Sequence, residues 1–316
     1  MLNLPGLAKP TCPIILGVAD LGGSVDQETS FAIMDRYVEA GGNHFDTAHI
    51  YAAWLPGRVG SSERTLGRWL RSRGLVGKML IATKGAHMAL DGVYAPRVRP
   101  ECIHADLQES LDRLGVDRVD LYYLHRDDPT VPVECLLAAL EAERARGRIG
   151  AYACSNWALP RLHEAQALAA ARGWAGFAVN QMAWSLAAQP AEGPMSTYAV
   201  DPLYRRWHRE TGLPLACYSS QAVGFFARTW TWPSQGHAKK FDAYCTETNV
   251  RRAWRAQAYA AARGVTPTRI ALAWLLHQGH PVLPIIGGKT VAQISDSMAA
   301  LKLSLSPGEV RDLERA

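Results

Sequence analysis

Three features that would narrow the class of protein are missing from this sequence of 316 residues. It has no stretch of about 18 uninterrupted apolar residues, so we expect no membrane-spanning segment. The opening MLNLPGLAKP lacks a charged start followed by an apolar run, so we expect no export signal. The six cysteines stand far apart and form no CxxC pair, which is typical of reduced thiols. Together these absences predict a soluble protein of the cytoplasm.

Blocks of charge of one sign are also missing. The 34 Lys and Arg residues and the 29 Asp and Glu residues leave a net charge of +5, and no run of like charges occurs. This pattern gives no support to nucleic-acid binding. The histidines have no partners at the spacing of metal ligands, so we expect no metal site. We expect a small-molecule substrate as the partner, and the composition leaves a homo-oligomer open.

The sequence does contain a repeated alternation of short apolar runs with longer segments of helical periodicity. This alternation is typical of βα units around a parallel sheet, and eight units are typical of a (β/α)8 barrel, the TIM barrel. No Pro-, Gly- or Ser-rich linker divides the chain, so we expect one domain over residues 1–316. The predicted strands are residues 14–18, 43–46, 79–83, 120–124, 149–154, 177–180, 215–218 and 282–285.

Helical patterns lie between these strands. Several of them end at a glycine, which suits the left-handed conformation that commonly terminates a helix. These glycines are Gly41, Gly74, Gly147 and Gly173. The predicted helices include residues 28–40, 62–73, 101–114, 133–146, 160–172, 251–263 and 267–278.

Four polar side chains stand at or just after the ends of the second, third and fourth predicted strands, namely Asp46, Tyr51, Lys84 and His125. In such a barrel the carboxyl ends of the strands share one rim, where the active site lies. A tyrosine with a pKa near about 10 donates a proton poorly at neutral pH, and a nearby cation lowers that pKa. We expect Lys84 to be this cation and Asp46 to keep it charged. His125 would orient a substrate carbonyl toward Tyr51.

Two stretches interrupt the alternation, and both follow a predicted strand, which places them on the same rim. Residues 219–249 are rich in Gly, Trp, Phe and Lys. Residues 185–198 carry Pro190 and Pro194, which break any helix there. Loops of this length in compact domains are usually either functional or disordered.

Several motifs resemble the aldo-keto reductase family in their order and spacing. They are GGNHFDTAHIY, SERTLGRWL, ATKG, DLYYLH, the strand ends CSN, NQ and YSS, and the tail PIIGGKTVAQISDS, and the resemblance covers roughly residues 12–305. It implies an NADPH-dependent oxidoreductase that reduces an aldehyde or ketone. In this enzyme Tyr51 would be the general acid. Lys84 and Asp46 would tune the pKa of Tyr51, and His125 would position the carbonyl.

The resemblance also implies a set of residues that bind the cofactor, NADPH or NADP+. No G-x-G-x-x-G turn stands between a strand and a helix, and the long loop would instead wrap the pyrophosphate with backbone amides. The implied residues are Ser155, Asn156, Gln181 and Tyr218 at the nicotinamide, Ser219, Ser220, Gln221 and Gly224 at the pyrophosphate, Gly287 and Lys289 at the 2′-phosphate, and Gln293 at the adenine.

The sequence departs from the family pattern at positions that bear on ligands. Ser297 stands where an Asn commonly reaches adenine, and we expect it at the surface. The segment AAWLPGRVGS after Tyr51 is longer and more aromatic than the usual turn. An open, partly aromatic mouth with Arg and His suits a sugar-like or anionic carbonyl compound. The substrate candidates are Trp54, Arg58, His87 and Arg126, with Trp184, Trp230 and Trp232 as further aromatic residues in loops of this rim.

Two other functions remain open at this point. Lys84 could be the nucleophile of a Schiff-base aldolase, since barrels host such lysines. Asp46 argues against this, because a paired lysine stays charged and is a poor nucleophile. The chain could also be a cofactor-binding regulatory subunit, as the potassium-channel β subunits of the same family illustrate.

Overall fold

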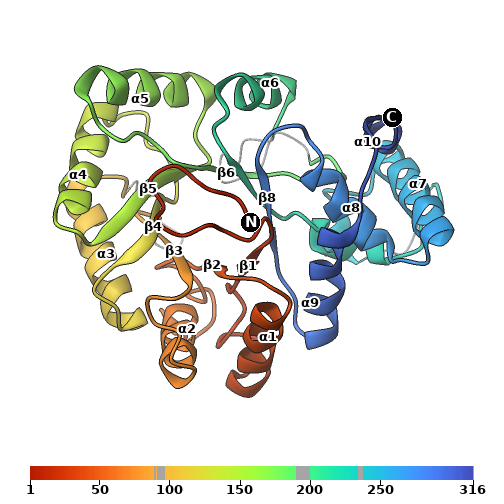
Figure 1. The fold of residues 1–316 in the computed structure, drawn as a ribbon, viewed down its shortest axis with the longest axis horizontal. Helices are drawn as coiled ribbons and strands as arrows, with labels where there is room; N and C mark the ends of the chain where they lie inside the picture. Colours follow the sequence, from red (N-terminus) through yellow and green to blue (C-terminus); the bar gives the residue numbers. More distant parts are fainter. Residues whose placement is uncertain (89, 91–96, 190–199, 234–237, 316) are drawn as a thin grey trace.

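Eight parallel strands form a closed barrel, which confirms the predicted fold class. The computed structural model of the protein describes residues 1–88, 90, 97–189, 200–233 and 238–315. Each strand pairs with its neighbours in sequence, and the eighth closes the barrel against the first (Figure 1). The strands are β1 (Ile15–Gly17), β2 (His44–Asp46), β3 (Leu80–Gly85), β4 (Val119–Leu124), β5 (Ile149–Ser155), β6 (Asn180–Ala183), β7 (Leu215–Tyr218) and β8 (Val282–Ile286).

Helices surround the barrel. The predicted glycine stops are confirmed, because Gly41, Gly74, Gly147 and Gly173 all have positive φ angles. The helices are α1 (Gln27–Glu39), α2 (Ser61–Ser72), α3 (Pro100–Leu114), α4 (Val133–Ala145), α5 (Leu159–Arg172), α6 (Pro202–Thr211), α7 (Glu247–Arg263), α8 (Pro267–Leu276), α9 (Val291–Met298) and α10 (Pro307–Glu314). Short 3-10 helices are η1 (Ala222–Ala227), η2 (Lys239–Phe241) and η3 (Ala299–Lys302).

Strand β6 begins later than the sequence predicts. We expected residues 177–180, whereas β6 covers Asn180–Ala183. The chain already approaches β5 upstream of the strand, because the Ala178 N–H donates a hydrogen bond to the Tyr152 carbonyl at 2.9 Å. Regular pairing with β7 starts only at Asn180, opposite Leu215. The apolar run at residues 177–180 therefore corresponds to the segment that leads into the sheet, and only its last residue belongs to the strand.

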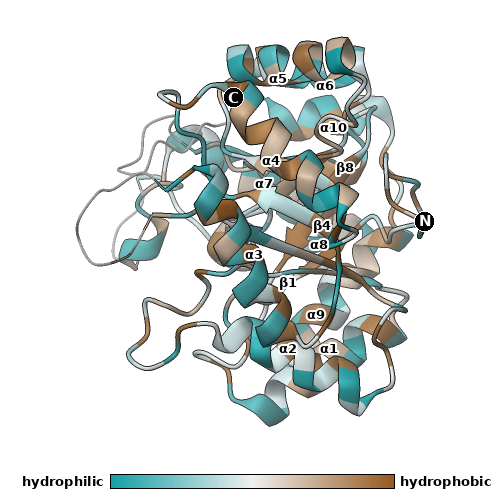
Figure 2. Cartoon of the chain, turned by 90° about the vertical axis from the view of Figure 1, so that its left-hand side faces the viewer, coloured by the Kyte–Doolittle hydropathy of each residue, from teal (hydrophilic) through white to brown (hydrophobic). Residues whose placement is uncertain are grey.

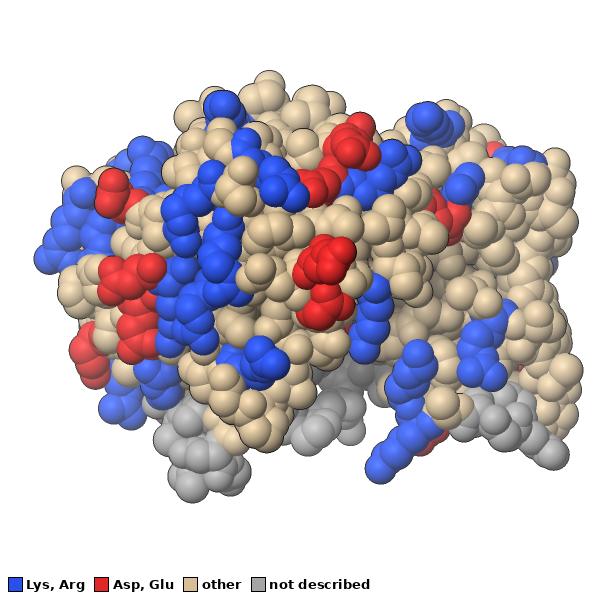
Figure 3. Space-filling model, turned by 90° about the horizontal axis from the view of Figure 1, so that it is seen from below, with Lys and Arg blue, Asp and Glu red and all other residues tan. Residues whose placement is uncertain are grey.

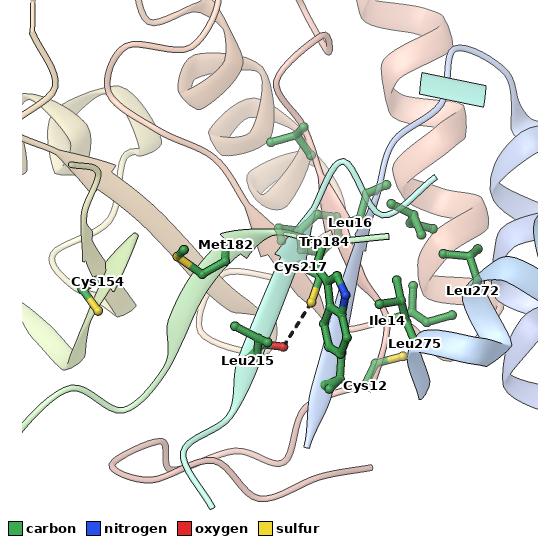
Figure 4. Packing of buried hydrophobic residues seen from close by; sticks show 14 of the residues in the cluster. Cys12, Ile14, Leu16, Cys154, Met182, Trp184, Leu215, Cys217, Leu272 and Leu275 are labelled. Atoms are coloured by element: carbon green, nitrogen blue, oxygen red, sulfur yellow. Dashed lines mark hydrogen bonds between the residues drawn. The ribbon is translucent and has the colours of Figure 1, made fainter. Parts of the chain in front are cut away.

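Two hydrophobic layers lie on the two sides of the barrel wall. The inner layer fills the barrel with side chains such as Ala82, Tyr123 and Leu283. The outer layer packs the strands against the helices, and Figure 4 shows part of it, including the buried thiols of Cys154 and Cys217. Burial raises the pKa of both thiols, as expected for inert core cysteines. In Figure 2 the surrounding helices carry both hydrophobic and hydrophilic residues, as expected of helices with one face on the strands and the other in solvent.

The N-terminal segment closes the amino-terminal end of the barrel. Leu2 and Thr11 form an antiparallel bridge, and Leu4 is buried in the inner layer between them. Lys9 Nζ donates to the carbonyl of Met79 at 2.8 Å and pairs with Asp120 at 3.0 Å, at the starts of β3 and β4. In Figure 1 this segment crosses the centre of the barrel. The opposite end, where the strands terminate, is left for the candidate site.

The outer surface carries charges of both signs. Figure 3 shows Lys and Arg side chains interspersed with Asp and Glu over one face. Among the described residues, no helix is long and apolar enough to cross a membrane. Over the same part of the chain, no group of three or more His, Cys, Asp or Glu side chains is placed to hold a metal ion. The predicted stretch 185–198 lies mostly outside the described residues, including Pro190 and Pro194.

Candidate active site

The structure brings three of the four predicted rim residues into direct contact. Lys84 near the end of β3 is fully buried, and its ammonium group is 2.5 Å from Asp46 Oδ1 at the end of β2. The same ammonium donates to the Tyr51 hydroxyl at 2.8 Å and to the Thr47 carbonyl at 2.9 Å. One lysine thus joins a carboxylate to a phenol within the barrel wall.

The turn that carries Tyr51 is held by the neighbouring strand and helix. Thr47 N–H donates to the Ala82 carbonyl, and His49 N–H donates to the Lys84 carbonyl, both at 2.9 Å. The Thr47 hydroxyl also lies 2.9 Å from the Ser62 hydroxyl of α2. These bonds fix the distance between Tyr51 and Lys84 through the backbone.

Charge pairing and burial act in opposite directions on the two central groups. Burial alone would lower the pKa of Lys84, but Asp46 and Tyr51 hold it above its ordinary value. Burial raises the pKa of Tyr51, and the nearby Lys84 acts to lower it. The net pKa of Tyr51 is raised, so the expectation of a lowered value is wrong for the protein by itself. The reason is that desolvation of the phenolate outweighs the lysine's attraction.

His125, directly after β4, faces this group as a neutral ring. Burial, and then the charge of Lys84, place its pKa well below the ordinary value. Its ring lies 5.8 Å from the Tyr51 ring, centroid to centroid. Its Nδ1 is buried and has no hydrogen-bond partner within the described part of the chain. A neutral imidazole beside a tyrosine can hydrogen-bond a carbonyl group without placing a second cation there.

The four predicted substrate residues differ in their placement. The His87 ring is buried and lies 4.6 Å from the His125 ring. Trp54 is 49% exposed, and its ring lies 6.2 Å from that of Tyr51. Arg126 is half-buried, and its positive charge adds to the effect of burial in lowering the pKa of both histidines. Arg58 is exposed, and no described side-chain contact ties it to this group.

Two of the further aromatic candidates belong to the core instead. Trp184 is buried against Trp274, with ring centroids 5.3 Å apart. Trp230 is buried and stacks on Phe225 at 4.5 Å. Both rings belong to the hydrophobic layer that packs the strands against the helices. Trp232 is exposed.

The residues predicted around the nicotinamide form one hydrogen-bonded group at the ends of β5, β6 and β7. Tyr218 Oη donates to Asn156 Oδ1 at 2.7 Å, and Asn156 Nδ2 donates to Ser155 Oγ at 2.9 Å. Asn156 has a positive φ of 61°, uncommon for a residue with a side chain. Gln181 Nε2 donates to Asp46 Oδ2 at 2.9 Å. The Asn156 N–H donates to the Gln181 carbonyl at 3.1 Å, so Gln181 links this group to the Lys84 centre.

The loop after β7 turns sharply at the positions predicted for the pyrophosphate. Ser219 and Gly224 both have positive φ angles, as do Ala222 and Val223 between them. Two N–H groups close the turn internally, because Ala222 N–H donates to the Ser219 carbonyl at 2.8 Å and Gly224 N–H donates to the Gln221 carbonyl at 2.9 Å. The Ser220 hydroxyl is committed elsewhere, because it donates to the Ile285 carbonyl at 2.6 Å. Residues 234–237 of this loop lie outside the described residues.

The residues predicted for the adenosine end surround the start of α9. Lys289 is exposed, and its N–H donates to Gln293 Oε1 at 2.7 Å. The Gly287 N–H donates to Gln221 Oε1 at 3.2 Å, while Gln221 Nε2 donates to the Ser297 hydroxyl at 2.8 Å. Ser297 is only 1% exposed, so its expected surface position is wrong. It anchors the loop after β7 to α9.

Residues that support the Tyr51 turn were not assigned from the sequence. Glu63 of α2 is fully buried and accepts a hydrogen bond from the Thr83 hydroxyl at 2.7 Å. Arg113 of α3 pairs with Glu63 at 3.2 Å and donates to the His49 carbonyl at 3.0 Å. The only signal in the sequence was the glutamate of the SER motif, which reads as an ordinary helix-start acid.

The comparison that decides the family rests on nearly the whole chain. A sequence profile described as "Aldo/keto reductase family" matches residues 13–316. The chain belongs to the aldo/keto reductase family. The resemblance of the strand-end motifs is thereby confirmed, and the protein is an oxidoreductase enzyme that acts on small carbonyl compounds.

Curated relatives of this aldo-keto reductase are distant. It is 27% identical to the Schizosaccharomyces pombe aldo-keto reductase yakc, whose name includes NADP(+), over 98% of this chain and 90% of the relative. It is 28% identical to the norsolorinic acid reductase stcV of Emericella nidulans, over 96% and 77% of the two chains. It is 29% identical to the uncharacterized oxidoreductase YrpG of Bacillus subtilis, over 95% and 90%.

Proposed function

We propose that the protein uses NADPH to reduce an aldehyde or ketone to the alcohol, with Tyr51 as the proton donor. The observation that carries this proposal is the ammonium of Lys84 bonded to both Asp46 and Tyr51. A tyrosine that gives up its proton becomes a phenolate, and a charged lysine at 2.8 Å stabilises that phenolate. Asp46 keeps the lysine protonated in a site where burial alone would favour loss of its proton.

His125 and Tyr51 would hold the substrate carbonyl between them. The neutral His125 ring provides a hydrogen bond at the carbonyl oxygen, and the Tyr51 hydroxyl provides the proton. Because the Lys84 ammonium already donates to three oxygens, it has no donor left for the substrate. It therefore acts through Tyr51 rather than on the carbonyl directly.

The residues present fit a nicotinamide dinucleotide. Gly287 and Gly224 border open space, since a Cβ built on either would meet no atom within 4 Å. The tight turn from Ser219 to Gly224 would bring the remaining backbone N–H groups to the pyrophosphate, and Lys289 adds a cation near the start of α9. Ser155, Asn156, Gln181 and Tyr218 would hold the nicotinamide, while Gln221 and Gln293 shape the adenosine end. When bound, NADPH supplies the hydride.

The substrate pocket suits a polar carbonyl compound, either sugar-like or anionic. Arg126 brings a guanidinium group, which binds carboxylate, phosphate or sulfonate well. Trp54 offers an exposed aromatic face beside Tyr51, on which a sugar ring can stack. Among the described cysteines none is disulfide-bonded, which supports a cytoplasmic location. We further propose that residues 1–316 act as one domain.

A screen of NADPH oxidation over ketoses, oxo-sugars, 2-oxo acids and aromatic aldehydes tests this proposal. We expect turnover, with the best rates on polar or anionic carbonyl compounds. Tight NADPH binding with no turnover across the panel would indicate a regulatory subunit instead. The aldolase alternative is disfavoured because Asp46 holds the pKa of Lys84 up; borohydride trapping of a substrate adduct on Lys84 would revive it.

A further inference from the structure

The turn that carries His87 is rigidly held from outside the site. The Ala86 N–H donates to Asp106 Oδ2 at 2.8 Å, and Asp106 of α3 is itself almost fully buried. Arg97 pairs with Asp106 at 2.7 Å and donates to the His87 carbonyl at 2.9 Å. Ala86 has a positive φ of 60°, a conformation that these bonds stabilise. The backbone of His87 is therefore held in place by the protein itself.

The hydrogen bonds of His87 determine which ring nitrogen carries its proton. Nδ1 lies 2.8 Å from the Met88 carbonyl oxygen, and a carbonyl only accepts, so Nδ1 must be the donor. Burial, and then the positive charges of Arg126 and Arg97, lower the pKa of His87. The ring is therefore neutral near pH 7, and Nε2 carries a lone pair. Nε2 has no hydrogen-bond partner among the residues that the structure describes.

The His87 ring lies beside the groups that would hold the reacting carbonyl. The His87 ring is 4.6 Å from the His125 ring, which in turn is 5.8 Å from the Tyr51 ring. Tyr51 donates its proton, and the guanidinium group of Arg126 can only donate. Nε2 of His87 is a hydrogen-bond acceptor in this otherwise donor-rich group. A group on the substrate that meets it must bring a proton of its own.

We propose that His87 determines substrate specificity, with Nε2 accepting a hydrogen bond from a hydroxyl group on the carbon next to the reacting carbonyl. The substrate class is then an α-hydroxy aldehyde or α-hydroxy ketone, and the inference rests on the proposed reductase function. A substrate without this hydroxyl would displace water from Nε2 and leave the acceptor unpaired. Sites built to hydrogen-bond a substrate hydroxyl discriminate in this way against analogues that lack it.

The test compares lactaldehyde with propanal, which differ only in the α-hydroxyl group. We expect the native enzyme to have the higher kcat/KM for lactaldehyde. In His87→Phe, which keeps a planar ring against His125 but removes the acceptor, the ratio of the two kcat/KM values should fall by about three- to tenfold. His87→Gln offers an amide oxygen as acceptor and should restore part of the ratio. His163→Phe on α5 is the matched control and should keep the native ratio.

The outcomes separate this inference from the reductase proposal. NADPH oxidation with both aldehydes at equal kcat/KM, or an unchanged ratio in His87→Phe, overturns the role of His87 and leaves the reductase standing. No turnover of any carbonyl compound by the native protein overturns both. NADPH binding by each variant, followed by fluorescence, establishes folding. If His87→Phe fails to bind NADPH, His87→Leu takes its place. Loss of the lactaldehyde preference in His87→Leu supports the role of His87, and a retained preference overturns it.

Discussion

The ammonium of Lys84 has all three of its protons in use. They point to a carboxylate, a backbone carbonyl and the Tyr51 hydroxyl. In this arrangement Tyr51 cannot receive a hydrogen bond from Lys84 and give one back to it, so its own proton is directed elsewhere. This arrangement agrees with the proposed role of Tyr51 as the proton donor.

Tyr51→Phe tests this role. The ring that contacts Trp54 and His125 stays, and only the proton donor is lost. We expect the rate of carbonyl reduction to fall by roughly 10² to 10⁴, with NADPH affinity near the native value. Tyr259→Phe on α7, whose hydroxyl bonds Asp312 at the surface, is the control. Native turnover in Tyr51→Phe would exclude the assignment.

Lys289 provides a test of cofactor choice. Its side chain is exposed at the start of α9, where a phosphate monoester would gain a charge-assisted hydrogen bond. We expect NADPH to bind more tightly than NADH. In Lys289→Ala this preference should shrink by about 1.5–3 kcal/mol, measured as the two Kd values. Lys302→Ala, an exposed lysine on η3, should leave the preference intact, and equal affinities in the native protein would refute the role.

At the scale of elements, the strand ends were the most predictable part of the molecule. A polar residue after an apolar run predicts where a parallel strand leaves the barrel, and this placed Asp46, Lys84 and His125 on one rim. Ser297 could not be predicted, because its burial depends on Gln221, which reaches it from a loop 76 residues away. The raised pKa of Tyr51 was likewise beyond the sequence, since desolvation depends on the packed surroundings.

Helix α6 is tied to β6 by a buried histidine. His208 Nδ1 donates to the Leu213 carbonyl at 2.8 Å, so Nε2 accepts from Asn180 Nδ2 at 3.1 Å. Burial lowers the pKa of His208 to about 4. An unfolded histidine titrates near about 6.5, so between these values only the unfolded chain binds the proton. This histidine therefore contributes stability that is complete above about pH 6.5 and is lost as the pH falls toward about 4.

Urea unfolding at a series of pH values measures this contribution. We expect the unfolding free energy to decrease below about pH 6.5, by up to about 1.4 kcal/mol per pH unit for this residue. His208→Gln retains a donor and an acceptor but does not titrate, so its profile should be flatter over this window. His163→Gln, at an exposed position of α5, should follow the native profile. Equal slopes in all three proteins would contradict the assignment.

At the scale of the whole molecule, the two ends of the barrel have separate tasks. The N-terminal segment fills one end with Leu4, and the candidate site occupies the other. Leu4→Ala should lower the unfolding free energy by about 2–5 kcal/mol, as expected for a buried leucine. NADPH affinity, measured under folding conditions, should stay near the native value. Leu301→Ala, at a partly exposed leucine, should change stability by less than about 0.5 kcal/mol. A large loss of affinity in Leu4→Ala would show that the ends are coupled.

The packing of Leu4 in the inner layer also determines when the N-terminal segment can fold during synthesis. Leu4 leaves the ribosome before every strand of the barrel, yet the apolar cluster that receives it includes Ala151, Ala216 and Leu283, from strands across the whole sequence. During synthesis the N-terminal segment therefore cannot bury Leu4 in the complete cluster until almost all of the strands have emerged. Contacts between such distant residues form slowly. Docking of the N-terminal segment onto the complete cluster is thus a late event of biogenesis, because Leu283 of β8 belongs to that cluster.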